Sequence, residues 1–170
     1  MTGQYLGMTL SIPDLDGENA AYFRFCAQGE LRLQRCKACS LVRYPPGPAC
    51  PWCTGDTFDW VPMSGRGTVY SYTEVRHAVQ PAFRPYVPYL ALLVELDEQR
   101  GQPSEHEAIR MIGNLALPDG SLAPPEVVRT VGIGSRVRIV FAPAGPDLAI
   151  PLWTLDVAHA NGAKPWRYPE

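Results

Sequence analysis

Residues 36–53 read CKACSLVRYPPGPACPWC, and this stretch decides the fold. It holds two Cys-x2-Cys pairs, Cys36 with Cys39 and Cys50 with Cys53, which are separated by ten residues. Each pair can direct two thiolates at one metal ion from a tight turn, and two such turns complete a tetrahedral sulfur site. Because four sulfurs close the coordination shell, the pattern predicts a structural zinc ion rather than a catalytic one.

The cysteine spacing alone leaves two other chemistries open. The thiols could form a disulfide pair in an exported protein, or a redox-active dithiol. Arg35, Lys37 and Arg43 lie in or beside the first pair, where their positive charges would favour the thiolate forms that bind a metal. Between the two pairs, residues 41–48 are expected to form a short strand and a proline-rich return.

Upstream of the first pair, residues 19–28 are predicted to form a helix that ends at a glycine. Tyr22, Phe25 and Cys26 share one face of this helix, so we interpret Cys26, the fifth cysteine, as a buried structural thiol. Residues 30–35 then alternate with the two-residue period of a strand that leads into the first pair.

Downstream of residue 61 the pattern changes to short apolar runs bounded by turn residues. Five strands are predicted, at residues 69–75, 90–96, 109–115, 136–141 and 152–157. An antiparallel unit of this kind can close as a small barrel of the OB type, which removes most exposed edges, although the pattern alone also allows a sandwich. Pro151 suits an edge strand or a strand start, because proline cannot donate to a ladder.

The composition limits both fold and function. With 18 prolines and 15 glycines in 170 residues, the chain is interrupted too often for a helical bundle, so a mainly β fold is expected. The sequence shows neither a long apolar run nor a secretory leader, so we expect a soluble, cytoplasmic protein without a membrane partner. The 15 basic and 17 acidic residues are evenly spread, which disfavours a nucleic-acid partner. The alternative function is a single-stranded nucleic-acid-binding OB-fold, with stacking rings at Tyr70, Tyr72 and Trp153.

Two long loops, residues 77–89 and 118–131, carry apolar side chains that we expect to be exposed. Prolines stiffen both loops at low entropic cost, and aromatic side chains on a stiff loop form a ready contact surface for a protein. The alternative is that such a loop folds back to cover its own core. The residues that we assign to partner binding are His77, Phe83, Arg84, Tyr86 and Tyr89.

The sequence shows no catalytic constellation. His77, His106 and His159 are scattered, and no nucleophile elbow, phosphate-binding glycine loop or paired-carboxylate motif accompanies them. We therefore expect no catalytic residues in this chain.

The motifs follow in the order ELRLQRCKAC at residues 30–39, CPWC at 50–53, SGRGTVYSYT at 64–73 and PYLALLVEL at 88–96. This order, from about residue 17 to residue 158, resembles the family called domain of unknown function thirty-five, which joins an N-terminal rubredoxin-like zinc ribbon to a C-terminal OB-fold associated with acyl-CoA. We accordingly divide the chain into an N-terminal extension at 1–16, a helix and zinc ribbon at 17–60, an OB-fold at 61–158 and a tail at 159–170.

The resemblance implies a non-catalytic accessory subunit that forms a hetero-oligomer with an enzyme. In that family the partners are thiolase-like enzymes, including sterol-carrier-type thiolases and the aldolases derived from them, or MaoC-like enoyl-CoA hydratases. It also implies that the zinc is structural and that acyl-CoA is a ligand shared with the partner, which carries the catalytic residues. Residues 118–130 and 162–170 depart from the family pattern, which leaves the choice of partner open.

Overall fold

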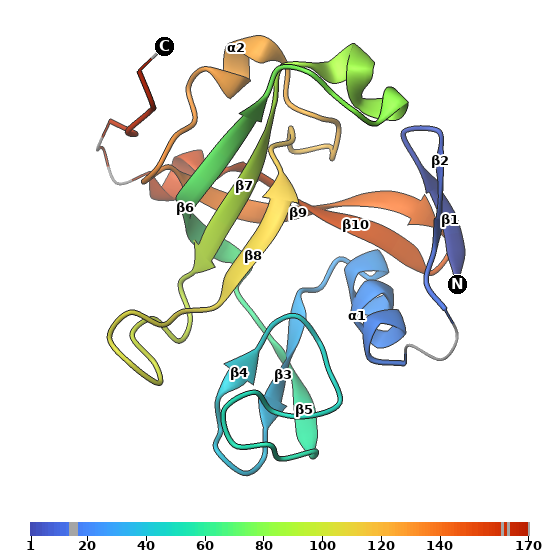
Figure 1. Cartoon of the computed structure of the whole chain (residues 1–170), viewed down its shortest axis with the longest axis vertical. Coiled ribbons are helices and arrows are strands. Elements are labelled where there is room, and N and C mark those ends of the chain that lie inside the picture. Colours follow the sequence, from blue (N-terminus) through green and yellow to red (C-terminus); the bar gives the residue numbers. More distant parts are fainter. Residues whose placement is uncertain (14–16, 161, 163, 170) are drawn as a thin grey trace.

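The computed structural model describes residues 1–13, 17–160, 162 and 164–169. These residues form a small N-terminal hairpin, a three-stranded ribbon and a five-stranded sheet that curls into a barrel. Figure 1 shows the ribbon below the barrel, with helix α1 (Gly17–Ala27) beside the ribbon and under the β9–β10 hairpin. Neither α-helix of the described chain has the length and apolar content needed to span a bilayer.

The ribbon is an antiparallel sheet in which β3 lies between two partners. Its strands are β3 (Arg32–Cys36), β4 (Val42–Arg43) and β5 (Phe58–Pro62). Helix α1 turns Tyr22 and Cys26 into the main apolar core, so the predicted burial of the Cys26 thiol is confirmed. Phe25 does not share this buried face; its ring packs on Trp60 instead, with a centroid distance of 5.3 Å.

The five-stranded sheet closes into the predicted OB-type barrel. Its strands are β6 (Arg66–Val75), β7 (Tyr89–Leu96), β8 (Arg110–Asn114), β9 (Arg136–Gly145) and β10 (Leu148–Leu155), in the order β10-β9-β6-β7-β8. All strand pairs are antiparallel, and a parallel bridge between Leu115 and Trp153 joins the two ends of the sheet. The amide of Ala116 donates to the Trp153 carbonyl at 2.7 Å. This closure excludes the sandwich.

The β9–β10 hairpin is longer than predicted, because both strands continue past prolines. Pro143 pairs with Ala149, and Pro151 pairs with Phe141. A proline is tolerated in these strands because β10 is the last strand in the order and β9 pairs with β6 only at residues 136–138. The predicted edge position of Pro151 is therefore confirmed.

The N-terminal segment forms a hairpin that the sequence analysis did not predict. Strands β1 (Thr2–Tyr5) and β2 (Met8–Ser11) are joined by Leu6 and Gly7, whose φ angles are 50° and 77°. Two consecutive residues with positive φ match the right-handed twist of a tight hairpin. The hairpin packs on β9, and Gly3 approaches the Ala144 carbonyl so closely that a Cβ would not fit there.

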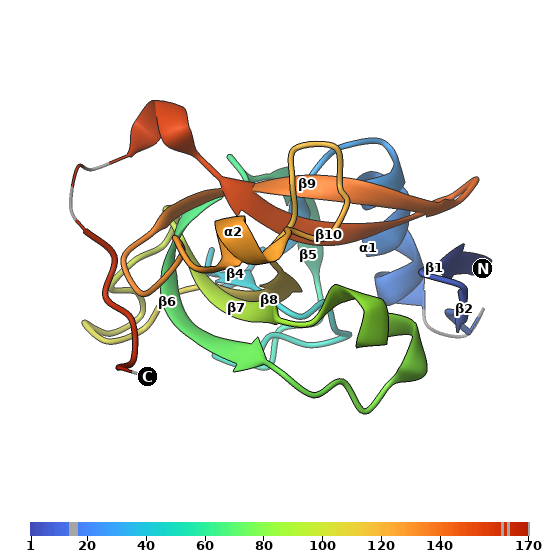
Figure 2. The same ribbon diagram turned by 90° about the horizontal axis from the view of Figure 1, so that it is seen from above.

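The expectation of exposed apolar side chains at residues 118–131 is wrong. Leu122, Ala123, Val128 and Val131 are all buried, and the segment contains the short helix α2 (Pro125–Val128). Figure 2 shows α2 lying over one end of the barrel. The loop therefore folds back as a lid over its own core, which was the alternative for both loops.

The described part of the C-terminal tail is tied to the barrel. Trp166 forms an isolated antiparallel bridge with Ile133, and the amide of Tyr168 donates to the hydroxyl of Tyr72 at 2.9 Å. Arg167 pairs with Glu74 at 2.6 Å and also donates to the Val128 and Val131 carbonyls. The tail thus packs along the barrel wall.

Candidate functional site

The four cysteines of the two Cys-x2-Cys pairs meet at one site in the ribbon. Their sulfur atoms all lie within 4.8 Å of one another, and the Cys36–Cys53 and Cys39–Cys50 sulfur separations are both 3.6 Å. Four Zn–S bonds of about 2.3 Å in a tetrahedron place the sulfurs about 3.8 Å apart. A disulfide needs about 2.05 Å, so these separations fit a metal site and exclude disulfide pairing in this structure. The four donors therefore fit a structural zinc ion.

The two cysteine turns are built alike. The carbonyl of Cys36 accepts the amide of Ser40 at 2.9 Å, and the carbonyl of Cys50 accepts the amide of Thr54 at 2.9 Å. Ser40 and Thr54, each directly after the second cysteine of its pair, have φ angles of 63° and 62°. This left-handed conformation reverses the chain immediately after the second sulfur, so both sulfurs of a pair face the same point.

Backbone amides favour thiolates at the first cysteine of each pair. The amide of Cys39, followed by that of Ala38, lowers the pKa of the Cys36 thiol. At Cys50, burial acts to raise the pKa, but the amides of Trp52 and Cys53, together with side-chain hydrogen bonds from Cys39 and Cys53, outweigh it and lower the pKa to about 6. Four sulfurs at this spacing repel one another once they are ionised, so a bound cation is needed to neutralise their charge.

A buried polar pair holds the segment between the two cysteine pairs. Gln34 on β3 and Arg43 on β4 are cross-strand partners and are both buried. The side-chain oxygen of Gln34 accepts from Arg43 Nε at 2.7 Å and from the amide of Gly47 at 2.9 Å, while Arg43 Nη2 donates to the Gly47 carbonyl. These bonds hold the proline-rich return in place, and no local feature of the sequence identifies Gln34 as their acceptor.

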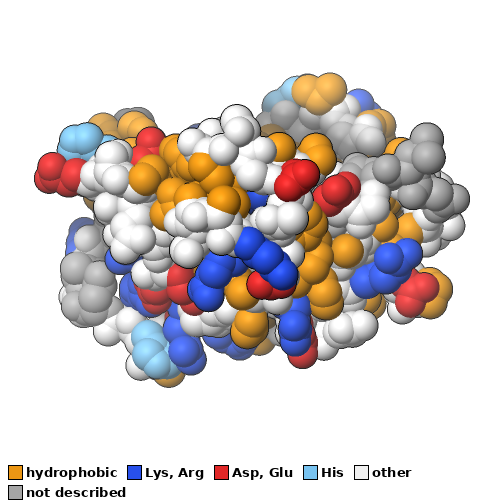
Figure 3. Space-filling model, turned by 90° about the horizontal axis from the view of Figure 1, so that it is seen from below, with side chains coloured by type: hydrophobic (Ala, Val, Ile, Leu, Met, Phe, Trp, Pro, Cys, Tyr) orange, Lys and Arg blue, Asp and Glu red, His pale blue; other side chains and the backbone are white. Residues whose placement is uncertain are grey.

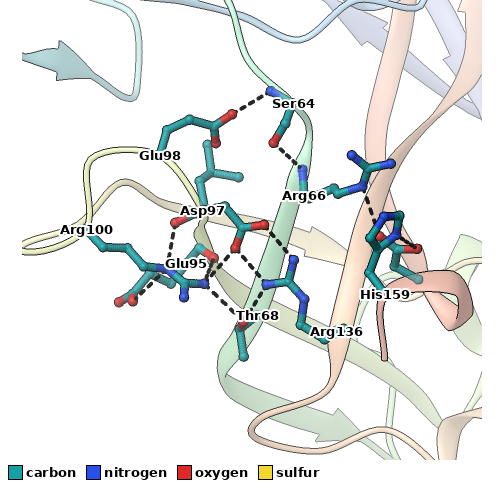
Figure 4. Close-up of polar contacts among 11 residues, drawn as sticks. Ser64, Arg66, Thr68, Glu95, Asp97, Glu98, Arg100, Arg136 and His159 are labelled. Atoms are coloured by element: carbon teal, nitrogen blue, oxygen red, sulfur yellow. Dashed lines mark hydrogen bonds and ion pairs between the residues drawn. The ribbon is translucent and has the colours of Figure 1, made fainter. Parts of the chain in front are cut away.

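The ribbon and the barrel are joined by the turn after β7. The side chain of Gln99 accepts from the amide of Val42 at 2.6 Å and donates to the Val42 carbonyl at 2.8 Å, so it continues the β4 ladder. Beside it, Glu98 accepts from the amide of Ser64 at 2.6 Å, a contact drawn in Figure 4. We call Glu98 and Gln99 the domain latch, because they fix the ribbon against the barrel.

A chain of ion pairs supports the domain latch (Figure 4). Asp97 accepts two hydrogen bonds from Arg136, at 2.7 and 2.5 Å, and one from Arg100 at 2.9 Å. The hydrogen bonds from the Arg136 guanidinium are the main reason why the pKa of Asp97 lies below its ordinary value. A bidentate pair of this kind has the geometry that makes a partly exposed ion pair stabilising.

The loop at residues 77–89 contains the 3-10 helix η1 (Pro81–Tyr86), and its side chains have different surroundings. His77, Arg84 and Tyr86 are exposed. Phe83 and Tyr89 are half-buried: their ring centroids lie 5.1 Å apart, and Phe83 also packs on Tyr5 of the N-terminal hairpin at 6.5 Å. Three of the five residues assigned to partner binding therefore face solvent, whereas the other two pack against neighbouring rings.

The rings considered for base stacking are not arranged as a platform. Trp153 is 1% exposed and Tyr72 is 9% exposed, whereas Tyr70 is exposed and carries the Arg110 guanidinium 4.1 Å from its ring centroid. On the face shown in Figure 3, Lys and Arg side chains alternate with Asp and Glu rather than forming a continuous basic field. Neither feature favours binding of a single strand.

His159 and Cys26, two titratable groups outside the ribbon, lie in structural surroundings. His159 Nδ1 lies 3.0 Å from Asp156, which also accepts from Arg66 Nε at 3.2 Å. Cys26 is buried, and burial raises the pKa of its thiol to about 12, so it is not an activated nucleophile.

Comparison with known proteins gives matches over both parts of the chain. Residues 23–59 match the model for the ChsH2 rubredoxin-like zinc ribbon domain, and residues 60–142 match the model for the ChsH2 C-terminal OB-fold domain. Among solved structures, a chain of an Ltp2-ChsH2(DUF35) aldolase is similar, with 34% identity and a TM-score of 0.66 over 86% of this chain and 100% of that chain.

Two curated relatives are longer than this chain. A probable enoyl-CoA hydratase alpha subunit of Thermomonospora curvata is 36% identical over 83% of this chain and 38% of its own length. A 3-oxo-4,17-pregnadiene-20-carboxyl-CoA hydratase alpha subunit of Mycobacterium tuberculosis is 33% identical over 85% of this chain and 40% of its own length. The chain therefore spans about two fifths of the length of these relatives.

Proposed function

Because the chain belongs to the ChsH2 (DUF35) family of zinc-ribbon and OB-fold proteins, we propose that it is a non-catalytic accessory subunit of an acyl-CoA enzyme. It assembles with a thiolase-like partner, of the sterol-carrier-type thiolase or aldolase kind, and helps to form that partner's acyl-CoA site. The observation that carries this proposal is the match to the aldolase chain, all of which has a counterpart here. A hydratase of the MaoC-like kind is the alternative partner, supported by the two hydratase alpha subunits.

The zinc ion has a structural role in this proposal. Cys36, Cys39, Cys50 and Cys53 hold it with a closed shell of four sulfurs, so it takes no part in catalysis. Its effect is to fix the ribbon, and the domain latch then fixes the ribbon against the barrel. A rigid two-part scaffold suits a subunit whose task is to complete another protein's site.

We place the partner interface on the loop at residues 77–89. Arg84, Tyr86 and His77 would contact the partner, because exposed aromatic and arginine side chains dominate interface energetics. Phe83 and Tyr89 would hold the loop in its presenting shape through their ring contacts. A preformed loop lowers the entropic cost of association.

The proposal is tested by purifying the chain from native extract and identifying the enzyme that co-purifies. Each subunit is then assayed alone and mixed, for acyl-CoA thiolysis, retro-aldol cleavage and enoyl-CoA hydration. We expect turnover only when the partner is present, and higher turnover in the mixture than in the partner alone. Turnover by this chain alone would contradict the accessory role, and restored hydration without carbon–carbon cleavage would identify the alternative partner.

A further inference from the structure

The C-terminal segment at residues 164–169 contacts the barrel in the way that an extended peptide contacts a receptor. The amides of Ile133 and Trp166 each donate to the other residue's carbonyl, at 2.9 Å in both directions. Gly132 allows this close approach, because a Cβ at that position would collide with the Trp166 carbonyl. Backbone pairing of this kind gives affinity for an extended segment, and side-chain contacts then give selectivity.

Arg167 makes the most selective of these side-chain contacts. Its guanidinium donates to the Val128 carbonyl at 2.8 Å and to the Val131 carbonyl, and it pairs with Glu74 at 2.6 Å. The guanidinium carbon also lies 5.3 Å from the centroid of the Tyr72 ring. A planar group with its donors in a fixed fork suits this set of acceptors, which favours arginine over lysine.

An aromatic residue lies on each side of Arg167 in the sequence. The amide of Tyr168 donates to the Tyr72 hydroxyl at 2.9 Å, and the centroids of these two rings are 5.6 Å apart. The rings of Trp166 and Tyr168 pack edge to face, with centroids 4.6 Å apart. The segment therefore reads as an arginine anchor between two aromatic residues that hold the peptide straight across the site.

The residues that receive the segment come from two parts of the barrel. Tyr72 and Glu74 lie on β6, whereas Val128 and Val131 belong to the lid at residues 118–131. Both valine side chains are fully buried, so their carbonyls belong to the part of the lid that covers the core. A segment bound here therefore ties the lid to β6.

We propose that Tyr72, Glu74, Val128, Val131 and Ile133 form a binding site for an extended peptide that carries an arginine between two aromatic residues. We call it the clasp site. The chain's own residues 164–169 occupy it, and their occupancy holds the lid closed over the end of the barrel. A tether raises the effective concentration of such a segment to about 1 mM, so a segment of modest affinity stays bound. The proposal is independent of the proposed function, because it uses only contacts within this chain.

The first test adds a fluorescent peptide of residues 164–169, KPWRYP, to the full-length chain and measures its binding by fluorescence polarisation. Arg167→Gln should release the chain's own tail and leave the clasp site open, whereas Lys164→Gln is a control that removes a charge from an exposed residue of the same tail. We expect Arg167→Gln to bind the peptide with a Kd of about 100 µM. Wild type and Lys164→Gln should bind it about tenfold more weakly, because their own tails compete.

A peptide with glutamine in place of the arginine should bind to Arg167→Gln about tenfold more weakly than KPWRYP, because the charge-assisted hydrogen bonds are lost. Absence of KPWRYP binding to folded Arg167→Gln, or equal binding to wild type, would overturn the proposal. Concentration-dependent dimers of the wild type in analytical ultracentrifugation would show that the tail occupies a second copy, and would overturn occupancy within one chain.

Hydrogen exchange tests the effect on the lid and separates it from a general loss of stability. The amide of Ile133, which donates to the Trp166 carbonyl, should exchange at least about tenfold faster in Arg167→Gln than in wild type or Lys164→Gln. Saturating KPWRYP should restore slow exchange. Faster exchange throughout the core strand β7, unaffected by the peptide, would show that Arg167 only supports the fold, and would overturn the proposal.

Discussion

Phe83 and Tyr86 lie three residues apart on η1, and substituting each with alanine should affect a different property, the stability of the chain for Phe83 and the affinity for the partner for Tyr86. Phe83 packs inward against Tyr5 and Tyr89, whereas Tyr86 faces solvent and is 38% exposed. We therefore expect Phe83→Ala to lower the stability of the isolated chain. Tyr86→Ala should leave that stability nearly unchanged and weaken the complex with the partner enzyme.

The expected magnitudes follow from these surroundings. Truncation of a fully buried phenylalanine costs about 3–5 kcal/mol, so a half-buried ring with two aromatic neighbours should cost about 2 kcal/mol. For a chain of this length, that corresponds to a Tm lower by about 4–8 °C. An exposed side chain contributes about 0.5 kcal/mol or less to folding. If Tyr86 is an interface hot spot, its truncation should cost about 2 kcal/mol of binding, or about thirtyfold in Kd.

Both quantities are measured on the same preparations. Differential scanning calorimetry gives the Tm of each variant, and surface plasmon resonance with the immobilised enzyme gives the Kd. An unchanged Tm for Phe83→Ala would refute the packing argument. A lowered Tm for Tyr86→Ala together with an unchanged Kd would remove this loop as the interface.

Four further outcomes are expected. Cys50→Ser should lose the zinc ion and unfold the ribbon, because metal binding and folding are coupled at such sites. Metal analysis should give one zinc ion per wild-type chain, and less than one in folded, reduced protein would contradict the site. Asp97→Asn should lower the Tm at neutral pH, and because Arg136 holds the pKa of Asp97 below its ordinary value, this loss of stability relative to wild type should persist above about pH 4. The loss should disappear as the pH falls through the native pKa, so a loss of stability that grew on acidification would contradict the argument. Gly113→Val should lower the free energy of unfolding by about 1–3 kcal/mol, since even a Cβ would lie 2.9 Å from the Trp153 ring. Fluorescence follows the Trp153 environment during melting, and an unchanged Tm would mean that the ring can move aside. Oligonucleotide binding at physiological salt should be weaker than micromolar, and tight, salt-sensitive binding in a filter assay would revive the nucleic-acid alternative.

The zinc site and the barrel strands were predictable because their signals are local. All four metal ligands fall within 18 residues, and their spacing specifies the two turns without any knowledge of the rest of the fold. The runs at residues 69–75, 109–115 and 136–141 alternate with the period of two expected for a sheet with one buried face, and residues 90–96 form a nearly continuous apolar run. The N-terminal hairpin had a signal of the same kind, since Leu6-Gly7 separates two short alternating runs, but a four-residue strand is too short to be decisive.

The remaining features depend on contacts between distant residues. Gln99 reaches Val42 across 57 positions, and nothing beside Gln99 in the sequence identifies it as part of the latch. The pairing of Arg66 on β6 with Arg138 on β9 requires the strand register, which a hydrophobic pattern does not supply at single-residue precision. The loop at 118–131 was judged by its composition, yet its apolar residues are buried because the open end of the barrel lies beside them.

The barrel closes only through a residue near the end of the chain, and this sets an order of events during translation. The ribbon is complete at Pro62, so its cysteines can take up zinc while the ribosome is still making the barrel. The bridge from Leu115 waits for Trp153, and helix α1, which packs on β10, waits for the same segment. A shortage of zinc would therefore affect the ribbon before the strands that close the barrel, β9 and β10, have been made.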